Sequence, residues 1–449
     1  MESRKPIGSR EGYTVEAVAL DGDCEISRVT GRPGALLQLK VEQPKLWSPD
    51  SPFLYQLHVK LFKDGQPADE VASYFGMRKI ALGREGGITR ILLNNEPLFQ
   101  FGPLDQGFWP DGLYTAPTDE ALRYDLEITK KLGFNMVRKH VKVEPDRWYY
   151  WCDKLGLLVW QDMPNGDEHA SWPHDGREIE RSAESAEQYR RELKALVDSR
   201  YNHPSIVMWV PFNEAWGQFD TVGIADWVKQ YDPSRLVNSA SGGNDFGVGD
   251  VKDDHFYPGP GAPPAERERA AVLGEFGGLG LPLADHTWQE EKSWGYRSFK
   301  NRDALTAAYL DLITKLRPLV ESRLSAAIYT QTTDVELEVN GLMTYDRAEV
   351  KMDAERVADA NRELYLPRPP LDSAASVAAS TLAYWRFEDG KPGNAVRDIR
   401  NAPRAVGARD VSGHNNHLCP HQHGRVDPGT VCLLFQARRP ERYSLTAHV

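Results

Sequence analysis

The sequence predicts an α/β protein in which a (β/α)8 barrel follows an incomplete β-sandwich. Three observations predict this fold class. Residues 13–80 contain short runs in which apolar and polar residues alternate, residues 89–366 alternate strand-like with helix-like segments, and two strand-like segments end on a glutamate. Because barrel enzymes keep their reactive groups at the C-terminal ends of strands, the third observation also predicts where a site would lie.

The first predicted domain spans residues 1–88 and has the pattern of antiparallel β-structure. Apolar residues alternate with polar ones at 35–41 and 53–62, and a turn follows at 63–66. A stretch of about 70 residues has room for about five strands, whereas a seven-stranded sandwich needs about 100 residues. The sequence therefore predicts a sandwich that lacks its first strands.

The predicted barrel covers residues 89–366. Thr118 begins a helix that ends at Gly133, a second helix stops at Gly156, and a third covers residues 187–201. Each helix is followed by a short apolar run, as in successive βα units. The expected strands number eight, as a barrel requires, and comprise residues 98–101, 134–138, 157–161, 205–210, 236–239, 254–257, 271–274 and 326–331.

Beyond the barrel, the Pro/Ala/Ser-rich residues 367–381 predict a linker, and residues 382–449 predict a further, shortened β-type segment. This segment contains a cluster of histidines and one cysteine. Its spacing matches no familiar zinc pattern, so we interpret it as a solvated loop. We expect neither a metal nor a cofactor in the protein. The cluster consists of His414, His417, Cys419, His421 and His423.

Composition excludes several classes of function. The 449-residue chain is 41% hydrophobic and has a formal net charge of -11 at pH 7, so it can bury a large core but offers no basic surface for nucleic acid or anionic membranes. No run of about 18 apolar residues suggests a membrane helix. Residues 1–10 lack the apolar stretch of a signal peptide, and the 4 cysteines do not indicate a compartment. Localisation, including a periplasmic or secreted parent protein, and oligomeric state stay open.

Two glutamates carry the functional prediction. Glu214 closes the apolar run 205–213, and Glu275 closes the run 271–274. Strand ends of a barrel meet at one mouth, so we expect these two carboxylates to converge. The alternative is that both are ordinary surface acids, which is the usual location of any single glutamate.

Several motifs, taken in order, resemble glycoside hydrolase family 2, the family of β-galactosidases, β-glucuronidases and β-mannosidases. The resemblance runs from about Leu46 to Arg347. It rests on Leu46-Trp-Ser-Pro-Asp-Ser-Pro-Phe-Leu-Tyr55, Phe75-Gly-Met-Arg-Lys79, Phe134-Asn-Met-Val-Arg138, Asn202-His-Pro-Ser-Ile-Val-Met-Trp209, Asn213-Glu214, Gly274-Glu-Phe-Gly277 and Thr333-Asp-Val-Glu-Leu-Glu-Val-Asn-Gly341.

The resemblance implies an immunoglobulin-like sandwich before the barrel, with Glu214 as acid/base and Glu275 as nucleophile. The family's usual N-terminal jelly-roll domain is not expected in this chain. Residues 384–388 and 410–418 resemble the beginning of a laminin-G-like, lectin-type sandwich. The implied function is that of a retaining exo-β-glycosidase acting on a β-galactoside or β-glucuronide.

This chemistry makes two demands on the glutamates. The carboxyl groups of a retaining pair should lie about 5 to 5.5 Å apart. Glu214 must start protonated, so we expect its pKa to be raised by burial and by the charge of Glu275.

Further site residues are expected around this pair. By resemblance, Asn213 binds the sugar 2-hydroxyl, although it could instead cap the next helix, and Tyr257 bonds to the nucleophile. Arg138 is expected to orient the nucleophile, and Trp216 to stack on the sugar. The remaining candidates for contact with sugar are His140, Asp162, His255, Tyr329 and Gln331, with Trp160 a weaker stacking candidate and Trp209 expected in the core.

The sequence departs from the family at one of these places. The family pattern is Arg-x-Ser-His before a Pro, whereas this chain has Arg138-Lys-His-Val-Lys-Val-Glu-Pro145. Three other functions therefore stay open: a catalytically impaired carbohydrate-binding fragment, a barrel glycosidase of another retaining family and, least favoured, a metal-dependent hydrolase.

Overall fold

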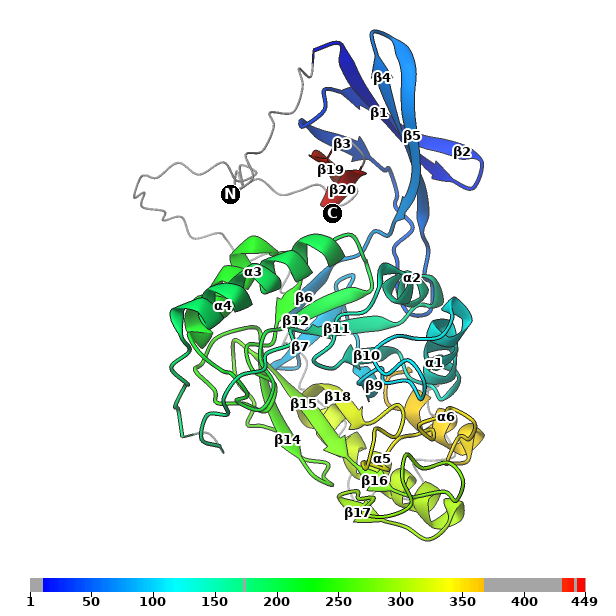
Figure 1. Cartoon of the computed structure of the whole chain (residues 1–449), viewed down its shortest axis with the longest axis vertical. Coiled ribbons are helices and arrows are strands. Elements are labelled where there is room, and N and C mark those ends of the chain that lie inside the picture. The colour runs from blue at the N-terminus through cyan, green and yellow to red at the C-terminus, as the bar shows by residue number, and fades with distance from the viewer. Residues whose placement is uncertain (1–10, 173–174, 367–429, 440–441, 449) are drawn as a thin grey trace, which may run out of the picture. The chain divides into compact units, whose positions relative to one another are not determined.

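The computed structural model describes residues 11–172, 175–366, 430–439 and 442–448 (Figure 1). The linker predicted at 367–381, the lectin-like segment up to residue 429 and the His/Cys cluster lie outside the described residues. No helix in the described part of the chain is both long and apolar enough to cross a membrane.

Eight parallel strands form the predicted barrel sheet, which is nearly closed. Its order is β13-β12-β11-β10-β9-β18-β15-β14, and all neighbouring pairs are parallel. The eight expected strands are confirmed, with ends displaced by a few residues. They are β9 (Gln100–Asp105), β10 (Met136–Lys139), β11 (Leu158–Asp162), β12 (Ile206–Val210), β13 (Leu236–Val237), β14 (Val251–Phe256), β15 (Ala270–Gly277) and β18 (Leu324–Thr330).

The predicted helix signals act as expected. The hydroxyl oxygen of Thr118 accepts a hydrogen bond from the backbone N–H of Ala121 and caps the first barrel helix, while Gly156 ends the second in the left-handed conformation. The described helices are α1 (Asp119–Lys131), α2 (Asp146–Leu155), α3 (Ala183–Arg200), α4 (Thr221–Tyr231), α5 (Arg302–Ser322) and α6 (Ala354–Arg362).

The alternation of strand and helix is not strict, which corrects the sequence-based expectation. Within the described residues, no helix separates β13 from β14 or β14 from β15. The first connection contains glycines at 242, 243, 247 and 249, and the second contains prolines at 258, 260, 263 and 264. Both residue types disfavour a helix interior, so these connections form loops.

The two faces of the barrel strands form separate cores. Met136, Trp160 and Ile328 belong to the cluster inside the barrel, whereas their neighbours Val137 and Val159 pack outward among the helices. This alternation is the ordinary pleat of a strand. The inward cluster fills the barrel interior. The polar side chains of the candidate site lie above it, at the C-terminal ends of the strands.

Antiparallel sheets precede the barrel, as predicted. Strands β1 (Tyr13–Asp21), β2 (Cys24–Gly31), β4 (Tyr55–Lys63) and β5 (Gln66–Phe75) form one sheet in the order β2-β1-β4-β5. Strand β3 (Leu36–Lys40) pairs instead with β19 (Thr430–Arg439), which pairs with β20 (Arg442–His448). The backbone of the C-terminal hairpin therefore extends a sheet begun by residues 36–40.

Two small sheets complete the described part. Strands β6 (Ile80–Glu85), β7 (Ile88–Leu93) and β8 (Glu96–Pro97) form one of them, with Gly86 and Gly87 at the hairpin turn. Ile80, Ile91 and Leu93 from this sheet join the cluster inside the barrel. Strands β16 (Leu279–Gly280) and β17 (Arg297–Ser298) form the other.

Candidate active site

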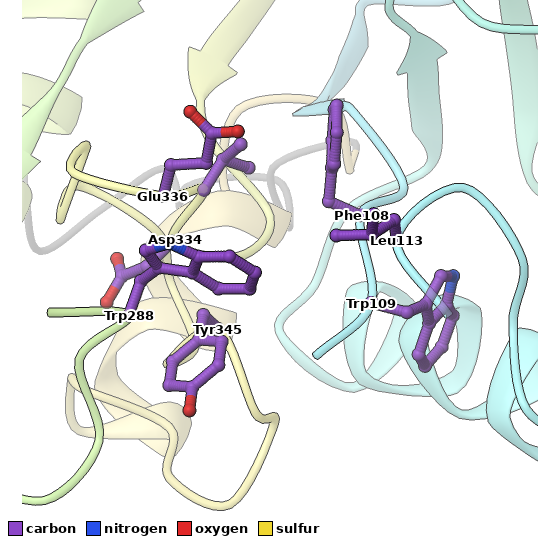
Figure 2. Close-up of a pocket in the computed structure, with 8 residues that line it drawn as sticks. Phe108, Trp109, Leu113, Trp288, Asp334, Glu336 and Tyr345 are labelled. Carbon is purple, nitrogen blue, oxygen red and sulfur yellow. The ribbon is translucent and has the colours of Figure 1, made fainter. Parts of the chain in front are cut away.

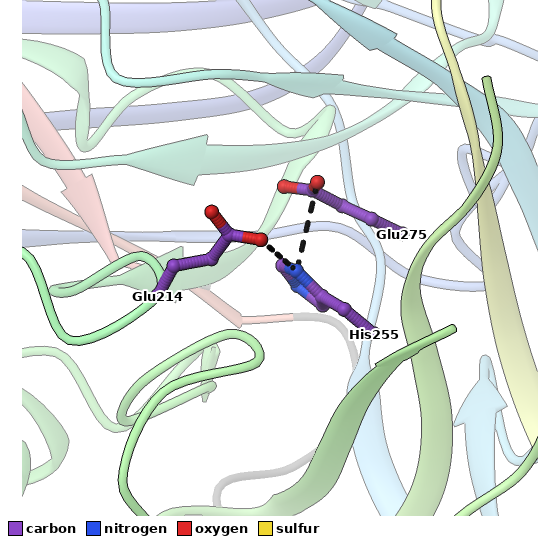
Figure 3. Close-up of side chains that lie close together, drawn as sticks. All are labelled: Glu214, His255 and Glu275. Atoms are coloured by element: carbon purple, nitrogen blue, oxygen red, sulfur yellow. Dashed lines mark hydrogen bonds and ion pairs between the residues drawn. The ribbon is translucent and has the colours of Figure 1, made fainter. Parts of the chain in front are cut away.

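Glu214 and Glu275 converge at the C-terminal ends of the barrel strands (Figure 3). Glu214 lies in the loop after β12, and Glu275 lies near the end of β15. A carboxylate oxygen of each and a ring nitrogen of His255 all lie within 4.8 Å of one another. The Glu214 side chain keeps 29% of its surface exposed and the Glu275 side chain 8%. The more exposed acid can therefore face an incoming ligand.

The backbone of Glu214 is held in an unusual conformation. Glu214 and Ala215 both have positive φ angles, 48° and 63°, which cost energy for residues with a Cβ. The surrounding chain holds this turn, because the N–H of Glu214 donates a 2.9 Å hydrogen bond to the carbonyl oxygen of Ser241. The turn aims the Glu214 side chain at the site.

Glu275 is held at both oxygens. The guanidinium of Arg138 donates to Oε1 at 3.2 Å, and the hydroxyl of Tyr257 donates to Oε2 at 2.6 Å. Burial, together with the charge of Glu275, raises the pKa of Tyr257 well above its usual value, so the phenol keeps its proton as a donor. A carboxylate fixed in this way presents a defined lone pair to an electrophile.

Arg138 connects several buried acceptors. Two of its nitrogens donate to the two oxygens of Asp162, at 3.1 and 3.0 Å, and one of these nitrogens also donates to Oδ1 of Asn213 at 2.8 Å. Although burial opposes the charge, Asp162 and Glu275 together raise the pKa of Arg138. Burial acts to raise the pKa of Asp162, but the charge of Arg138 prevails and lowers it. The pair is therefore ionised.

Asn213 is held by its amide oxygen, which leaves the amide nitrogen for another partner. Arg138 donates to Oδ1, whereas no residue of the described part accepts a hydrogen bond from Nδ2. Asn213 is 7% exposed. This geometry leaves an amide donor beside Glu214.

His255 lies between the two glutamates (Figure 3). Its Nδ1 is 2.8 Å from Oε1 of Glu214 and 3.5 Å from Oε2 of Glu275, and its Nε2 is 2.9 Å from Oγ of Ser241. Burial opposes the charged imidazolium, but Glu275 and Glu214 prevail and raise the pKa of His255. Both ring nitrogens have protein partners, so neither is left for a sugar hydroxyl, contrary to the expected contact.

The pKa of Glu214 has the opposite direction from the one that the sequence predicts. Burial raises it, but the hydrogen bond with His255 and the charges of His255, His140 and Arg138 outweigh burial and lower it. The expectation considered only burial and the charge of Glu275. In the structure, His255 stands between the two acids and favours the ionised form of Glu214.

Three other predicted residues differ in how far they are exposed at the site. Trp216 is 48% exposed and meets the ring of His169 edge to face at 4.3 Å, so its indole is open to a ligand. The side chain of His140 is 14% exposed and bonds to Asp162 through Nδ1. Asp162 itself is 1% exposed and serves Arg138 and His140, so it does not reach a sugar.

Tyr329 and Trp160 must be corrected as sugar contacts. Tyr329 is fully buried on the outer face of the barrel, where its ring packs against Phe276 and Tyr309. Trp160 fills the barrel interior and donates to Gln100. Trp209 belongs to the core, as expected. Gln331 is also buried, and its amide bonds to Gln106 and Asn340.

Sequence reasoning missed several residues at the site. Ser241 and Asp253 form hydrogen bonds behind His255, and the ring of Tyr296 stacks on Tyr257 with 3.8 Å between centroids. Asp253 lies two positions before His255 on β14, so strand alternation could have placed both on one face. Tyr296 lies in a segment without periodicity and gave no such signal.

The charges of the site are balanced by protein groups. Among the described residues, one group of three His, Cys, Asp or Glu side chains is close enough to share a cation. It consists of Glu214, His255 and Glu275. We do not assign them to a metal, because Arg138 already provides a buried positive charge and Nδ1 of His255 is hydrogen-bonded to Glu214.

A separate, small aromatic cavity lies between the loop after β9 and the segments around Trp288 and Tyr345 (Figure 2). None of the sequence-predicted site residues lines it. Arg347 lies 3.9 Å above the ring of Trp109 and forms an ion pair with Asp125. The cavity is lined by Phe108, Trp109, Leu113, Trp288, Asp334, Val335, Glu336 and Tyr345.

Comparisons with known proteins agree with this architecture. Residues 9–78 match the family described as glycosyl hydrolases family 2, and residues 114–258 match the TIM barrel domain of glycosyl hydrolases family 2. The second match includes Glu214, His255 and Tyr257 and ends before Glu275. The matched parts therefore belong to the sandwich and the barrel.

Curated relatives match about half of the chain. A β-galactosidase from Vibrio cholerae is 28% identical over 232 residues, which are 50% of this chain and 22% of the relative. A putative β-glucuronidase from Formosa agariphila is 32% identical over 209 residues, which are 46% of this chain and 19% of the relative. The match thus spans about a fifth of the length of these relatives.

Solved structures share the fold over a larger part of the chain. A β-D-glucuronidase from Dictyoglomus thermophilum superposes with a TM-score of 0.63 at 18% identity, covering 80% of this chain and 65% of that one. A β-galacturonidase from Eisenbergiella tayi, bound to galacturonate, gives a TM-score of 0.58 at 20% identity, covering 79% of this chain and 67% of that one.

Proposed function

We propose that this chain, which carries the sandwich and TIM barrel domains of glycosyl hydrolases family 2, is a retaining exo-β-glycosidase. Glu275 is the nucleophile and Glu214 the acid/base. The observation that carries this proposal is the pair of carboxylates at one barrel mouth, whose closest oxygens lie within 4.8 Å. Retaining pairs stand about 5 to 5.5 Å apart, whereas an inverting pair needs about 6.5 Å or more to hold a water molecule.

The surroundings of Glu275 suit a nucleophile. In the first step, an oxygen of Glu275 bonds to the anomeric carbon while the bond to the leaving oxygen breaks, and Glu214 gives that oxygen a proton. In the second step, Glu214 takes a proton from water, whose oxygen displaces Glu275. Arg138 and Tyr257 hold Glu275 in position for attack, and both can stabilise it again as a leaving carboxylate.

The proposed substrate is a β-linked galactoside or glucuronide. This proposal draws on the names of the relatives, a β-galactosidase and a putative β-glucuronidase. The free amide nitrogen of Asn213 suits the sugar 2-hydroxyl, and exposed Trp216 suits stacking on a pyranose or aglycone ring. His140, whose side chain is 14% exposed and bonds to Asp162, is a further candidate contact.

A panel of nitrophenyl β-glycosides tests the activity. We expect hydrolysis of at least one galactoside or uronide, with NMR showing the β-anomer as the first product. Glu214→Gln and Glu275→Gln should each reduce turnover by several orders of magnitude, whereas Glu355→Gln, an acid in the first turn of α6, should not. Near-normal activity of either site variant, or an α-anomer as first product, would overturn the assignment.

Azide separates the two roles. With an activated substrate, Glu275→Ala should be rescued to an α-glycosyl azide, because azide then replaces the nucleophile. Glu214→Ala should instead give a β-glycosyl azide, because azide attacks the glycosyl-enzyme in place of water. If both variants gave the same anomer, the roles would be wrongly assigned. Binding of sugar without turnover by the unaltered protein would contradict the enzymatic proposal and favour a carbohydrate-binding function.

A further inference from the structure

Four side chains form a continuous hydrogen-bonded series that ends on Glu214. Oγ of Ser241 donates to Oδ2 of Asp253 at 2.7 Å, Nε2 of His255 lies 2.9 Å from the same Oγ, and Nδ1 of His255 lies 2.8 Å from Oε1 of Glu214. Ser241 is fully buried and Asp253 is 5% exposed. The series therefore runs from the protein interior to the more exposed acid.

The series fixes which nitrogen of His255 carries a hydrogen. Asp253 accepts from the backbone N–H of Gly274 and from Nδ2 of Asn238, as an ionised carboxylate does, although burial raises its pKa above the usual value. The single hydrogen of the Ser241 hydroxyl therefore points to Asp253, and Oγ is left to accept. Nε2 of His255 must then be the N–H donor. Nδ1 is free either to accept a hydrogen from protonated Glu214 or to donate one to ionised Glu214.

We propose that Glu214 and His255 share the proton that acid catalysis uses, and that Ser241 and Asp253 are positioning residues that hold the imidazole in the tautomer able to accept it. This inference rests on the proposed function of Glu214 as acid/base. Transfer breaks the N–H bond of Nδ1 as an O–H bond forms on Oε1, so the pair keeps its net charge. That O–H bond then breaks when the leaving oxygen takes the proton.

The neighbouring charges support a proton shared by Glu214 and His255. Glu214, Glu275 and Asp253 face His255, and their charges raise its pKa against the effect of burial, while Arg138 and His140 act on Glu214. When Glu275 becomes an ester its negative charge disappears, so the imidazolium loses a stabilising neighbour. Glu214 is then left as the ionised base that the second step needs.

A series of leaving groups tests this proton transfer. In His255→Gln, Glu214 keeps a hydrogen-bonding neighbour but loses the base that holds its proton. We expect kcat/KM for alkyl and mononitrophenyl glycosides to fall by about 100-fold, the lower range for acid catalysis. For the dinitrophenyl glycoside, which needs no proton, the fall should be under about threefold. An equal fall for all leaving groups would overturn the proposal.

The pH profile is a second readout that a purely structural role would not change. The basic limb of kcat/KM reports the pH at which the proton needed for acid catalysis is lost. Glu214 and His255 together hold that proton more firmly than Glu214 alone, so the basic limb should move to lower pH in His255→Gln. Ser241→Ala and Asp253→Asn should move it in the same direction by less, because each leaves Glu214 and His255 in place. An unchanged basic limb in all three folded variants would contradict the proposal.

A matched control and a measurement without substrate complete the test. His286→Gln removes another histidine–carboxylate pair, with Asp346 at 2.7 Å, and should leave both readouts unchanged. In ¹⁵N NMR without substrate, Nδ1 of His255 should titrate at a lower pH in Glu214→Gln than in the unaltered protein. This shift is expected even if no glycoside is hydrolysed, so its absence would refute the shared proton independently of the proposed function. Thermal unfolding checks that each variant folds.

Discussion

The hydroxyl of Tyr257 donates a 2.6 Å hydrogen bond to Oε2 of Glu275. Tyr257 follows directly after β14, two positions beyond His255, which contacts Glu214. One strand end thus delivers both the donor that orients one carboxylate and the imidazole that contacts the other. Residues two apart on an extended chain share a face. The pairing of β14 with β15, whose register shifts between Asp254 and His255, sets His255 opposite Glu275.

Removing the Tyr257 hydroxyl should impair the step in which Glu275 reacts. In Tyr257→Phe the ring that stacks on Tyr296 remains, but Glu275 loses a charge-assisted hydrogen bond worth about 1.5 to 3 kcal/mol. We expect kcat/KM on an aryl glycoside to fall by about 10- to 100-fold. Tyr309→Phe, which removes a buried hydroxyl bonded to Asn361, is the matched control and should retain activity. Equal kinetics of Tyr257→Phe and the unaltered protein would contradict the role of this bond.

The pair of Arg138 and Asp162 predicts a pH dependence of stability. The pKa of Asp162 is lower in the folded chain than its usual value near 4. Its contribution is therefore complete above about pH 4 and is lost as the pH falls through the folded pKa. We expect Asp162→Asn to reduce the free energy of unfolding by about 3 kcal/mol at pH 7, the lower end of the range for breaking a buried ion pair, since it removes one of the two carboxylates paired with buried Arg138.

Urea unfolding at pH 7, 5, 4 and 3 measures this difference. The gap between Asp162→Asn and the unaltered protein should narrow only at the lowest pH values. Asp311→Asn removes an exposed ion pair with Lys315 and should change the free energy of unfolding by less than about 1 kcal/mol. A gap that did not change with pH would show that Asp162 is not stabilised as an ion.

Much of the barrel could be predicted from sequence, because its strands are short apolar runs with recognisable helix caps between them. The side of the barrel to which each residue points was harder to predict. In β18, Ala326 and Ile328 face the interior, whereas Ala327 and Tyr329 face the outer helices. Strands buried on both faces show no apolar–polar alternation, so no residue pattern in β18 indicates that Tyr329 points away from the site.

The position of the two glutamates was predictable, but the electrostatics between them was not. A strand end predicts where Glu214 and Glu275 meet, since parallel strands share one mouth. The pKa of Glu214 depends on His255, a residue of β14 that lies 41 positions further along the chain and meets Glu214 only when the barrel is folded. That contact is a property of the packed barrel and has no signature in local sequence.

The packing of β9 against β10 depends on one glycine. A Cβ on Gly102 would lie 2.0 Å from the carbonyl oxygen of Met136, which cannot move without displacing β10. Gly102→Ala should therefore reduce the free energy of unfolding by about 3 kcal/mol or more, the upper range for overpacking. Gly166→Ala, where an added Cβ meets nothing within 4 Å, is the control. Similar thermal unfolding of both variants would show that the two strands can separate without cost.

The exposed indole of Trp216 should contribute to binding more than to chemistry. It lies two residues after Glu214 and is 48% exposed, which leaves it open to stacking on a sugar or aglycone ring. An aromatic contact of about 0.5 to 1.5 kcal/mol predicts that Trp216→Ala raises KM by about 2- to 10-fold, with kcat changed less. Tyr124→Ala removes an aromatic ring of α1 that is 38% exposed and should leave both constants unchanged. If Trp216→Ala instead lowered kcat with KM unchanged, the indole would act through the position of Glu214, because its backbone N–H donates to the carbonyl oxygen of Asn213.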